Sequence, residues 1–161
     1  MSDDLDFDDD DFEDDEDEFD HFVAAQDTVY DTVVAELTAG KKQTHWMWFV
    51  FPVLTDIGES PMAMFYSLRD ADEARAYLAH PLLGQRLTDC MHLLLNHTGT
   101  DPVAIMGETD AYKLRACATL FEVAAPTTPV FAKMLDKMFG GQRCNKTLRI
   151  LRRPAPDDMF G

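Results

Sequence analysis

The sequence lacks long hydrophobic runs, paired cysteines and a basic N-terminus. Its longest unbroken apolar stretch, from Trp46 to Phe51, is far shorter than the roughly 18 residues that a membrane-spanning helix requires. The three cysteines, Cys90, Cys117 and Cys144, are odd in number and show no CxxC spacing, which favours reduced thiols over a disulfide framework. The acidic N-terminus is unlike a signal or transit peptide. We therefore expect a soluble, cytoplasmic protein that does not associate with membranes.

Strong enzyme signatures are also absent. The sequence contains no GxxxxGK[ST], GxGxxG, HExxH or GxSxG motif, so it predicts neither a phosphate-binding loop, a zinc-protease helix nor a nucleophile elbow. His92 and His97 are five residues apart, which is a poor spacing for two metal ligands on one helix face. We expect no metal site and no cofactor.

Basic residues are missing from the first 20 positions, which hold eleven Asp and three Glu. The remaining positions hold 16 acidic and 14 basic residues, so most of the net charge of −16 lies in this segment. Like charges at this density repel one another, and the few apolar residues among them cannot offset the entropic cost of ordering. We expect a disordered polyacidic arm over residues 1–18. The near-neutral body disfavours binding to nucleic acid.

Two interpretations of the arm stay open. It is either a solubilising tail or a segment that contacts a basic protein partner, with Phe7 and Phe12 among its acids. Five basic residues lie near the C-terminus, namely Arg143, Lys146, Arg149, Arg152 and Arg153. They form either a solvated helix face or a basic stripe that the acidic arm contacts.

Apolar residues between positions 22 and 37 recur at i, i+3, i+4 and i+7, which predicts one helix with a buried stripe. Asp20 is placed to cap its start and Gly40 to end it. Gln26 interrupts the stripe with a polar side chain. Residues 46–51, rich in aromatic and β-branched side chains, fit either a short strand or a buried helical turn.

Further helices are predicted from apolar spacing and from Pro, Gly and capping residues, over about residues 60–68, 70–79, 81–98, 102–106, 110–125, 129–139 and 145–151. Strand alternation and internal repeats are absent. The pattern predicts an all-α fold, an irregular compact bundle of seven or eight helices. The length of 161 residues favours one domain, over residues 19–153, followed by a loose tail over residues 154–161.

The segment from Lys41 to Pro52 carries the clearest functional signal. Two lysines, a threonine and His45 precede Trp46 and Trp48, and buried indoles and imidazoles need hydrogen-bond partners. Aromatic faces beside cations suit a ligand with a ring and a negative charge, such as a small phosphate-bearing or nucleotide-derived molecule. The alternative is that the tryptophans are core anchors and that His45 is a structural residue.

Four segments resemble, in order and spacing, the family called domain of unknown function 1810 (DUF1810). They are AQDTVYDTVVAELTAGKKQTHWMWFVFP, GESPMAMFYSL, EARAYLAHPLLGQRLTDC and KLRACATLF. The resemblance covers about residues 19–151 and implies a compact, mainly helical cytosolic domain. It implies no particular reaction, because the family is uncharacterised.

The resemblance also implies a set of recurrent polar positions, with His45 as the candidate catalytic residue. The candidate ligand-binding positions are Lys42, Trp46, Ser60, Tyr66, His80, Arg86, Lys113 and Arg115. The chain departs from the family pattern at Val53, where Gln is usual, and near Cys144, where an acid is usual. If those two positions contribute to binding, this chain binds its ligand differently.

The site hypothesis requires that His45, Trp46, His80 and Arg86 line one hollow, in which His45 would act as a general base in the hydrolysis of an N-glycosidic or ester bond. Each of these residues taken alone is more often structural. Lys113 and Arg115 should face opposite sides of their helix. The competing hypothesis is a non-enzymatic interaction module, in which the polar residues are architecture and the acidic arm meets a basic partner.

Overall fold

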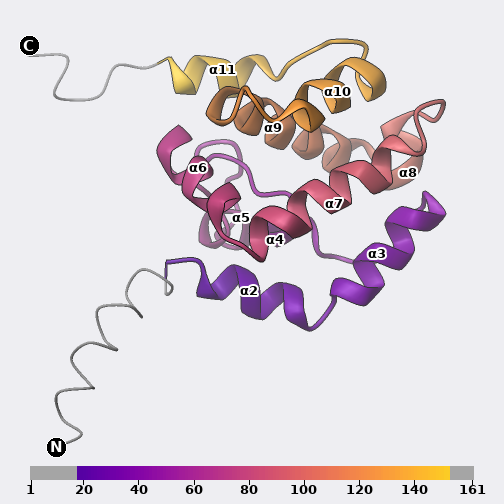
Figure 1. The fold of residues 1–161 in the computed structure, drawn as a ribbon, viewed down its shortest axis with the longest axis horizontal. Coiled ribbons are helices and arrows are strands. Elements are labelled where there is room, and N and C mark those ends of the chain that lie inside the picture. The colour runs from indigo at the N-terminus through magenta and orange to yellow at the C-terminus, as the bar shows by residue number, and fades with distance from the viewer. Residues whose placement is uncertain (1–17, 153–161) are drawn as a thin grey trace, which may run out of the picture.

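The computed structural model describes residues 18–152, which form ten helices (Figure 1). In chain order the helices are α2 (Asp20–Asp27), α3 (Tyr30–Ala39), α4 (Met47–Val50), α5 (Pro61–Phe65), α6 (Ala71–Ala79), α7 (Leu83–Leu95), α8 (Pro102–Met106), α9 (Glu108–Ala124), α10 (Pro129–Met138) and α11 (Asn145–Leu151). The predicted all-α class is confirmed, with a few more helices than expected. The β pairing found in this part of the chain is an isolated parallel bridge between Leu54 and Leu68.

Residues 1–17 and 153–161 lie outside the described residues. The predicted arm and tail therefore fall there, except for Glu18. No helix between residues 18 and 152 is long and apolar enough to cross a membrane.

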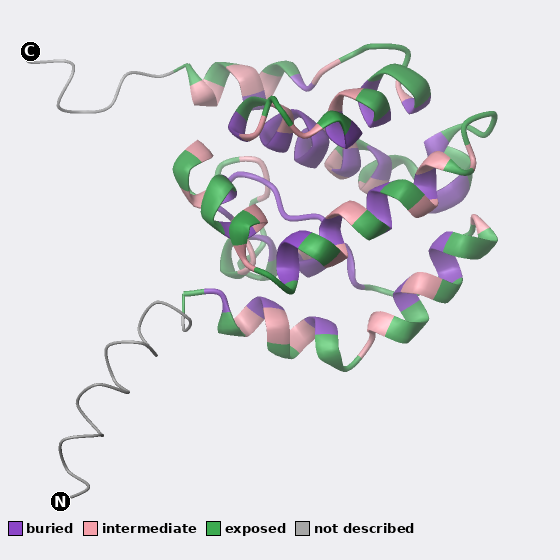
Figure 2. Ribbon diagram, viewed as in Figure 1, coloured by how far each residue is buried: buried purple, intermediate pink, exposed green. Residues whose placement is uncertain are grey.

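The two longest helices, α9 and α7, organise the bundle. Helix α9 packs against α6, α8, α10 and α11, and α7 packs against α3, α6 and α10. Figure 2 shows the buried faces of these helices turned toward the middle of the molecule, with α2 and α3 along its lower edge. One apolar core, which includes Leu87, Met91, Leu114, Phe121 and Phe131, runs through the whole domain.

The single helix predicted over residues 20–39 is wrong, because the chain bends at Thr28 and Val29 and forms α2 and α3 instead. β-Branched residues lose side-chain freedom in a helix, and the Thr28 hydroxyl donates to the Ala25 carbonyl, which competes with helix continuation. The bend lets α2 pack on α4 while α3 packs on α7. The start of α2 also lacks the predicted Asp20 cap, since Phe19 occupies the N-cap position. Gly40 ends α3 as predicted, with φ of 73°.

The ambiguous segment 46–51 forms the buried turn α4, so the strand alternative is wrong. Asp70 and Glu73 form a modified capping box at the start of α6. The Glu73 N–H donates to Asp70 Oδ1 at 2.9 Å, and Glu73 Oε1 accepts from the Arg69 N–H at 2.7 Å, which satisfies two backbone donors at the start of the helix.

Helix α7 approaches α6 closely at Gly84. A Cβ atom built on Gly84 would lie 1.9 Å from the Leu78 carbonyl oxygen, well inside van der Waals contact. The obstacle is backbone rather than the end of a flexible side chain, so a larger residue would force the two helices apart.

We predict that Gly84→Ala destabilises the domain by about 2 kcal/mol, because overpacking against backbone outweighs the better helix propensity of alanine. Urea unfolding measures this as a lower midpoint with an unchanged slope. Gly99→Ala is the matched control, since a Cβ there meets nothing within 4 Å. Equal midpoints for the two variants would contradict the packing argument.

Candidate functional site

A hollow of about 350 Å³, which we call the His45 hollow, opens between the loop after α3, helix α4 and the start of α9. The loop contributes Lys42 and His45, α4 contributes Trp48, and α9 contributes Asp110 and Lys113. Three of the predicted site residues, Lys42, His45 and Lys113, therefore line the same hollow. His45 is exposed at its mouth.

One buried carboxylate, that of Glu36 in α3, holds the loop that carries Lys42 and His45. Glu36 Oε1 accepts from the backbone N–H of Gln43 (2.9 Å) and Thr44 (3.2 Å) and from the indole Nε1 of Trp46 (2.9 Å). Its Oε2 accepts from the Thr44 hydroxyl at 2.7 Å. A buried carboxylate is costly unless donors of this kind surround it, so the anion and the loop stabilise each other.

These bonds also set the ionisation of Glu36. Burial raises the pKa of the carboxyl group, but the hydrogen bonds from Gln43, Thr44 and Trp46 together outweigh burial and lower the pKa to about 2. Glu36 is therefore an anion at neutral pH. The indole of Trp46 is only 1 % exposed and its N–H is satisfied, so Trp46 is a core anchor that does not line the hollow.

The ammonium group of Lys42 is already paired. Its Nζ lies 2.9 Å from Asp110 Oδ2 and donates to the Thr44 carbonyl at 2.7 Å, and the side chain is 6 % exposed. It also lies 4.8 Å from the ring centroid of Trp46. Lys42 thus ties the loop to α9, and Asp110 neutralises its charge.

A second, more apolar hollow of about 170 Å³ adjoins the first, and we call it the Tyr66 hollow. Trp48, Thr109 and Lys113 line both hollows. The additional walls of the Tyr66 hollow come from the following side chains: Phe51, Val53, Ile57, Ala63, Tyr66 and Tyr112. Val53, one of the two departures from the family pattern, therefore lines this hollow.

Lys113 stands at the boundary between the two hollows. Its Nζ lies 4.9 Å from the ring centroid of Trp48, and no carboxylate among residues 18–152 forms an ion pair with it. A cation on an aromatic face, beside an apolar space, is the arrangement that binds an anionic group attached to a ring.

The ligand-binding residues predicted from the sequence did not include Trp48, Thr109 or Tyr112. A signal for Trp48 was present: Trp46 and Trp48 are two positions apart, and such residues in a helical segment point about 200° apart, so both cannot enter the core. No local pattern singles out Thr109 or Tyr112, because their role depends on how α9 packs against α4.

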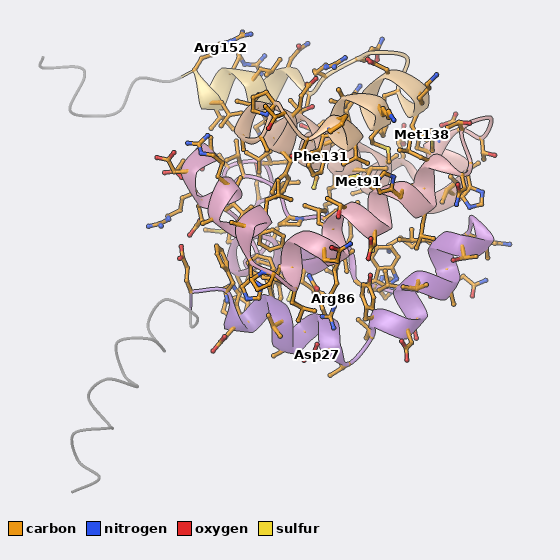
Figure 3. All side chains as sticks on the ribbon, viewed as in Figure 1. Asp27, Arg86, Met91, Phe131, Met138 and Arg152 are labelled. Atoms are coloured by element: carbon orange, nitrogen blue, oxygen red, sulfur yellow. The ribbon has the colours of Figure 1, made fainter. Side chains whose placement is uncertain are left out.

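Arg86 lies elsewhere, against α2. Its Nη2 lies 2.9 Å from Asp27 Oδ1 and its Nη1 donates to Gln26 Oε1 at 3.3 Å (Figure 3), with the guanidinium over the Tyr30 ring. Gln26 in turn donates to the Phe49 carbonyl (2.6 Å) and to the Tyr77 hydroxyl (3.1 Å). These hydrogen bonds and the ion pair join four helices, namely α2, α4, α6 and α7.

His80 and Ser60 occupy helix ends. His80 Nδ1 accepts from the backbone N–H of Leu82 and Leu83, both at 3.2 Å, at the start of α7. The Ser60 hydroxyl accepts from the Ala63 N–H at 3.1 Å and caps α5. The prediction that His45, Trp46, His80 and Arg86 line one hollow is therefore wrong. The indole of Trp46 is buried in the core, and internal hydrogen bonds hold His80 and Arg86 away from the His45 hollow.

Lys113 and Arg115 line different hollows, as the prediction of opposite orientations requires. Tyr112, which is 37 % exposed, lies between them. Over the described residues, no group of three or more His, Cys, Asp or Glu side chains is arranged to hold a metal ion.

We predict that Glu36→Gln lowers the free energy of unfolding at pH 7 by about 1–3 kcal/mol, because an amide places its NH₂ group among donors. Since the pKa of Glu36 is depressed to about 2, its contribution is complete above the unfolded-state pKa and falls as the pH drops from about 4.5 toward 2. Urea midpoints across this range should therefore converge for the wild type and the variant.

Glu59→Gln, which alters an exposed carboxylate in a loop, is the control and should leave the midpoint at pH 7 unchanged. A constant difference between wild type and Glu36→Gln down to pH 2 would refute the linkage.

Comparison with known proteins places this architecture in a family. A solved structure, that of the conserved hypothetical protein Rv1873 from Mycobacterium tuberculosis, superposes with a TM-score of 0.82 at 42 % identity, over 84 % of this chain and 97 % of that one. Among curated proteins, no relative matched the sequence. The model of the family described as "Protein of unknown function (DUF1810)" matches residues 16–151. The chain therefore belongs to the DUF1810 family.

Proposed function

We propose that this domain binds a small phosphate-bearing ligand that carries a flat ring, of the nucleotide-derived class, across the His45 and Tyr66 hollows. The observation that carries the proposal is the position of Lys113, a cation without a carboxylate partner among the described residues, on the Trp48 ring where the two hollows meet.

The volumes support a ligand of this shape. An apolar protein cavity of about 150 Å³ holds one benzene molecule, so the Tyr66 hollow of about 170 Å³ suits a single ring or a small heterocycle. The His45 hollow of about 350 Å³ is large enough for a sugar or phosphate group. Together they fall within the range of small-molecule sites, roughly 300–1,000 Å³.

The charges of the residues that line the two hollows limit the negative charge that the ligand can carry. Asp110 neutralises Lys42, so Lys113 supplies the one lysine charge in these hollows that is not already paired within the described residues. This favours a phosphate monoester or diester over a triphosphate, which would meet too few cations and would approach the Asp110 carboxylate.

His45 adds a candidate for chemistry to this binding site. An imidazole is able to take up or release a proton near neutral pH, and His45 is exposed at the mouth of the hollow that Lys113 lines. If the bound ligand is hydrolysed at an N-glycosidic or ester bond, His45 would be the general base. Binding does not require this role, and the two parts of the proposal are tested separately.

We expect adenosine monophosphate or ADP-ribose to bind the full-length protein with a saturable isotherm in calorimetry. Lys113→Gln should weaken binding about tenfold, because one charge-assisted contact is lost. Lys133→Gln, which removes the same charge from an exposed position on α10, is the matched control. His45→Ala should change affinity by less than about threefold and should abolish any turnover of the ligand.

The proposal fails if neither compound gives a saturable isotherm. It also fails if Lys113→Gln and Lys133→Gln bind with the same affinity. Turnover that survives in His45→Ala would remove His45 from the chemistry and leave the binding site intact.

A further inference from the structure

A third hollow, of about 440 Å³, lies on the other side of Tyr112, between α9, the loop after α10 and the start of α11. We call it the Arg115 hollow. Three of its lining residues are cations, namely Arg115, Arg143 and Lys146, and none of its lining residues is acidic. The His45 hollow, in contrast, contains the carboxylate of Asp110.

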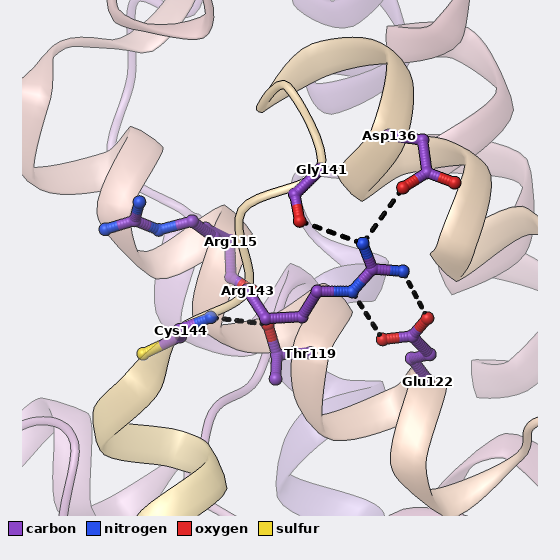
Figure 4. Close-up of polar contacts among 7 residues, drawn as sticks. All are labelled: Arg115, Thr119, Glu122, Asp136, Gly141, Arg143 and Cys144. Carbon is purple, nitrogen blue, oxygen red and sulfur yellow. Dashed lines mark hydrogen bonds and ion pairs between the residues drawn. The ribbon is translucent and has the colours of Figure 1, made fainter.

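Arg143 is a fixed part of the wall. It forms a bidentate salt bridge with Glu122, in which Nε donates to Oε1 at 3.0 Å and Nη2 donates to Oε2 at 2.5 Å. Its Nη1 donates to Asp136 Oδ1 at 2.9 Å and to the Gly141 carbonyl at 3.0 Å (Figure 4). These bonds raise the pKa of Arg143 above its ordinary value. Two carboxylates thus balance its charge, and its role is to fix the loop against α9.

Arg115 has no such partner among the described residues. Its Nη1 reaches Gln142 Oε1 only at 3.4 Å, and its Nε is buried without a hydrogen-bond partner. In Figure 4 its guanidinium points away from the Arg143 network. A guanidinium offers five donors in a planar fork that matches the oxygens of phosphate, and buried donors are rarely left unsatisfied. An external anion would pair with the terminal Nη nitrogens, to which Gln142 offers only one long contact.

The walls around Arg115 are held in place without a ligand. The Cys144 N–H donates to the Thr119 hydroxyl at 3.0 Å, and that hydroxyl donates to the Arg115 carbonyl at 2.8 Å. The loop turns through Gly140 and Gly141, both with positive φ, which glycine adopts without strain. A preformed site loses less entropy on binding than a flexible one.

From these contacts we infer that the Arg115 hollow is a second anion site, separate from the proposed ligand site. It would take a phosphate group, free or at the end of a larger molecule, with the Arg115 fork and the Lys146 ammonium as its ligands. The inference does not depend on the proposed function, because Lys113 is not among the residues that line this hollow.

The test is a titration of the full-length, ¹⁵N-labelled protein with inorganic pyrophosphate at constant ionic strength, followed by NMR. We expect saturable shifts in the backbone amides of residues 142–146. Arg115→Gln should weaken binding at least about tenfold, and Arg115→Lys should fall between that variant and the wild type, because it keeps the charge and loses the fork.

Lys146→Gln provides a second route if Arg115→Gln does not fold, and should weaken binding about threefold. Lys133→Gln is the control and should bind pyrophosphate as the wild type does. Shifts that do not saturate would indicate nonspecific charge attraction and overturn the inference. Binding that Lys133→Gln weakens as much as Arg115→Gln would overturn it as well. Shifts confined to the His45 hollow would overturn it as well and would leave the proposed function standing.

Discussion

The walls of the His45 and Tyr66 hollows depend on one buried anion, the carboxylate of Glu36. Its two oxygens accept four hydrogen bonds from Gln43, Thr44 and Trp46. Because those donors belong to the loop between α3 and α4, their geometry sets the path of the chain into α4. That path buries the indole of Trp46 and leaves Trp48 on the wall of both ligand-sized hollows. The stability of the loop and the position of the candidate site therefore have the same physical origin.

Several polar residues that suggested a site are structural. Gln26, Arg86 and His80 interrupt apolar segments, which is the pattern expected both of a cleft and of buried connections between helices. Each instead completes an internal set of hydrogen bonds, since Gln26 bridges α2 to α4 and α6, and His80 satisfies donors at the start of α7. A polar group in a core must find partners, and the sequence does not indicate whether those partners are protein or ligand.

The hollows lie around helix α9, in which Tyr112, Lys113 and Arg115 follow one another closely. Because successive residues of a helix point in different directions, Lys113 faces α4 while Arg115 faces the loop before α11. Two cations that lack carboxylate partners in the described part of the chain are thereby exposed to separate spaces. The two departures from the family pattern each line one of these spaces, since Val53 lines the Tyr66 hollow and Cys144 lines the Arg115 hollow. The chain therefore differs from the family pattern at residues that line these hollows.

Local patterns in the sequence determined the all-α class, most helix ends and the caps of α5 and α6, because helical periodicity and capping act within a few residues. They also singled out the segment with Lys42, His45 and Trp48. Only the tertiary structure decided which tryptophan is buried and which cations are paired. The physical reason is that Glu36, Asp110 and Gln26 meet their partners across different helices, and contacts between distant segments leave no periodic signal in the chain.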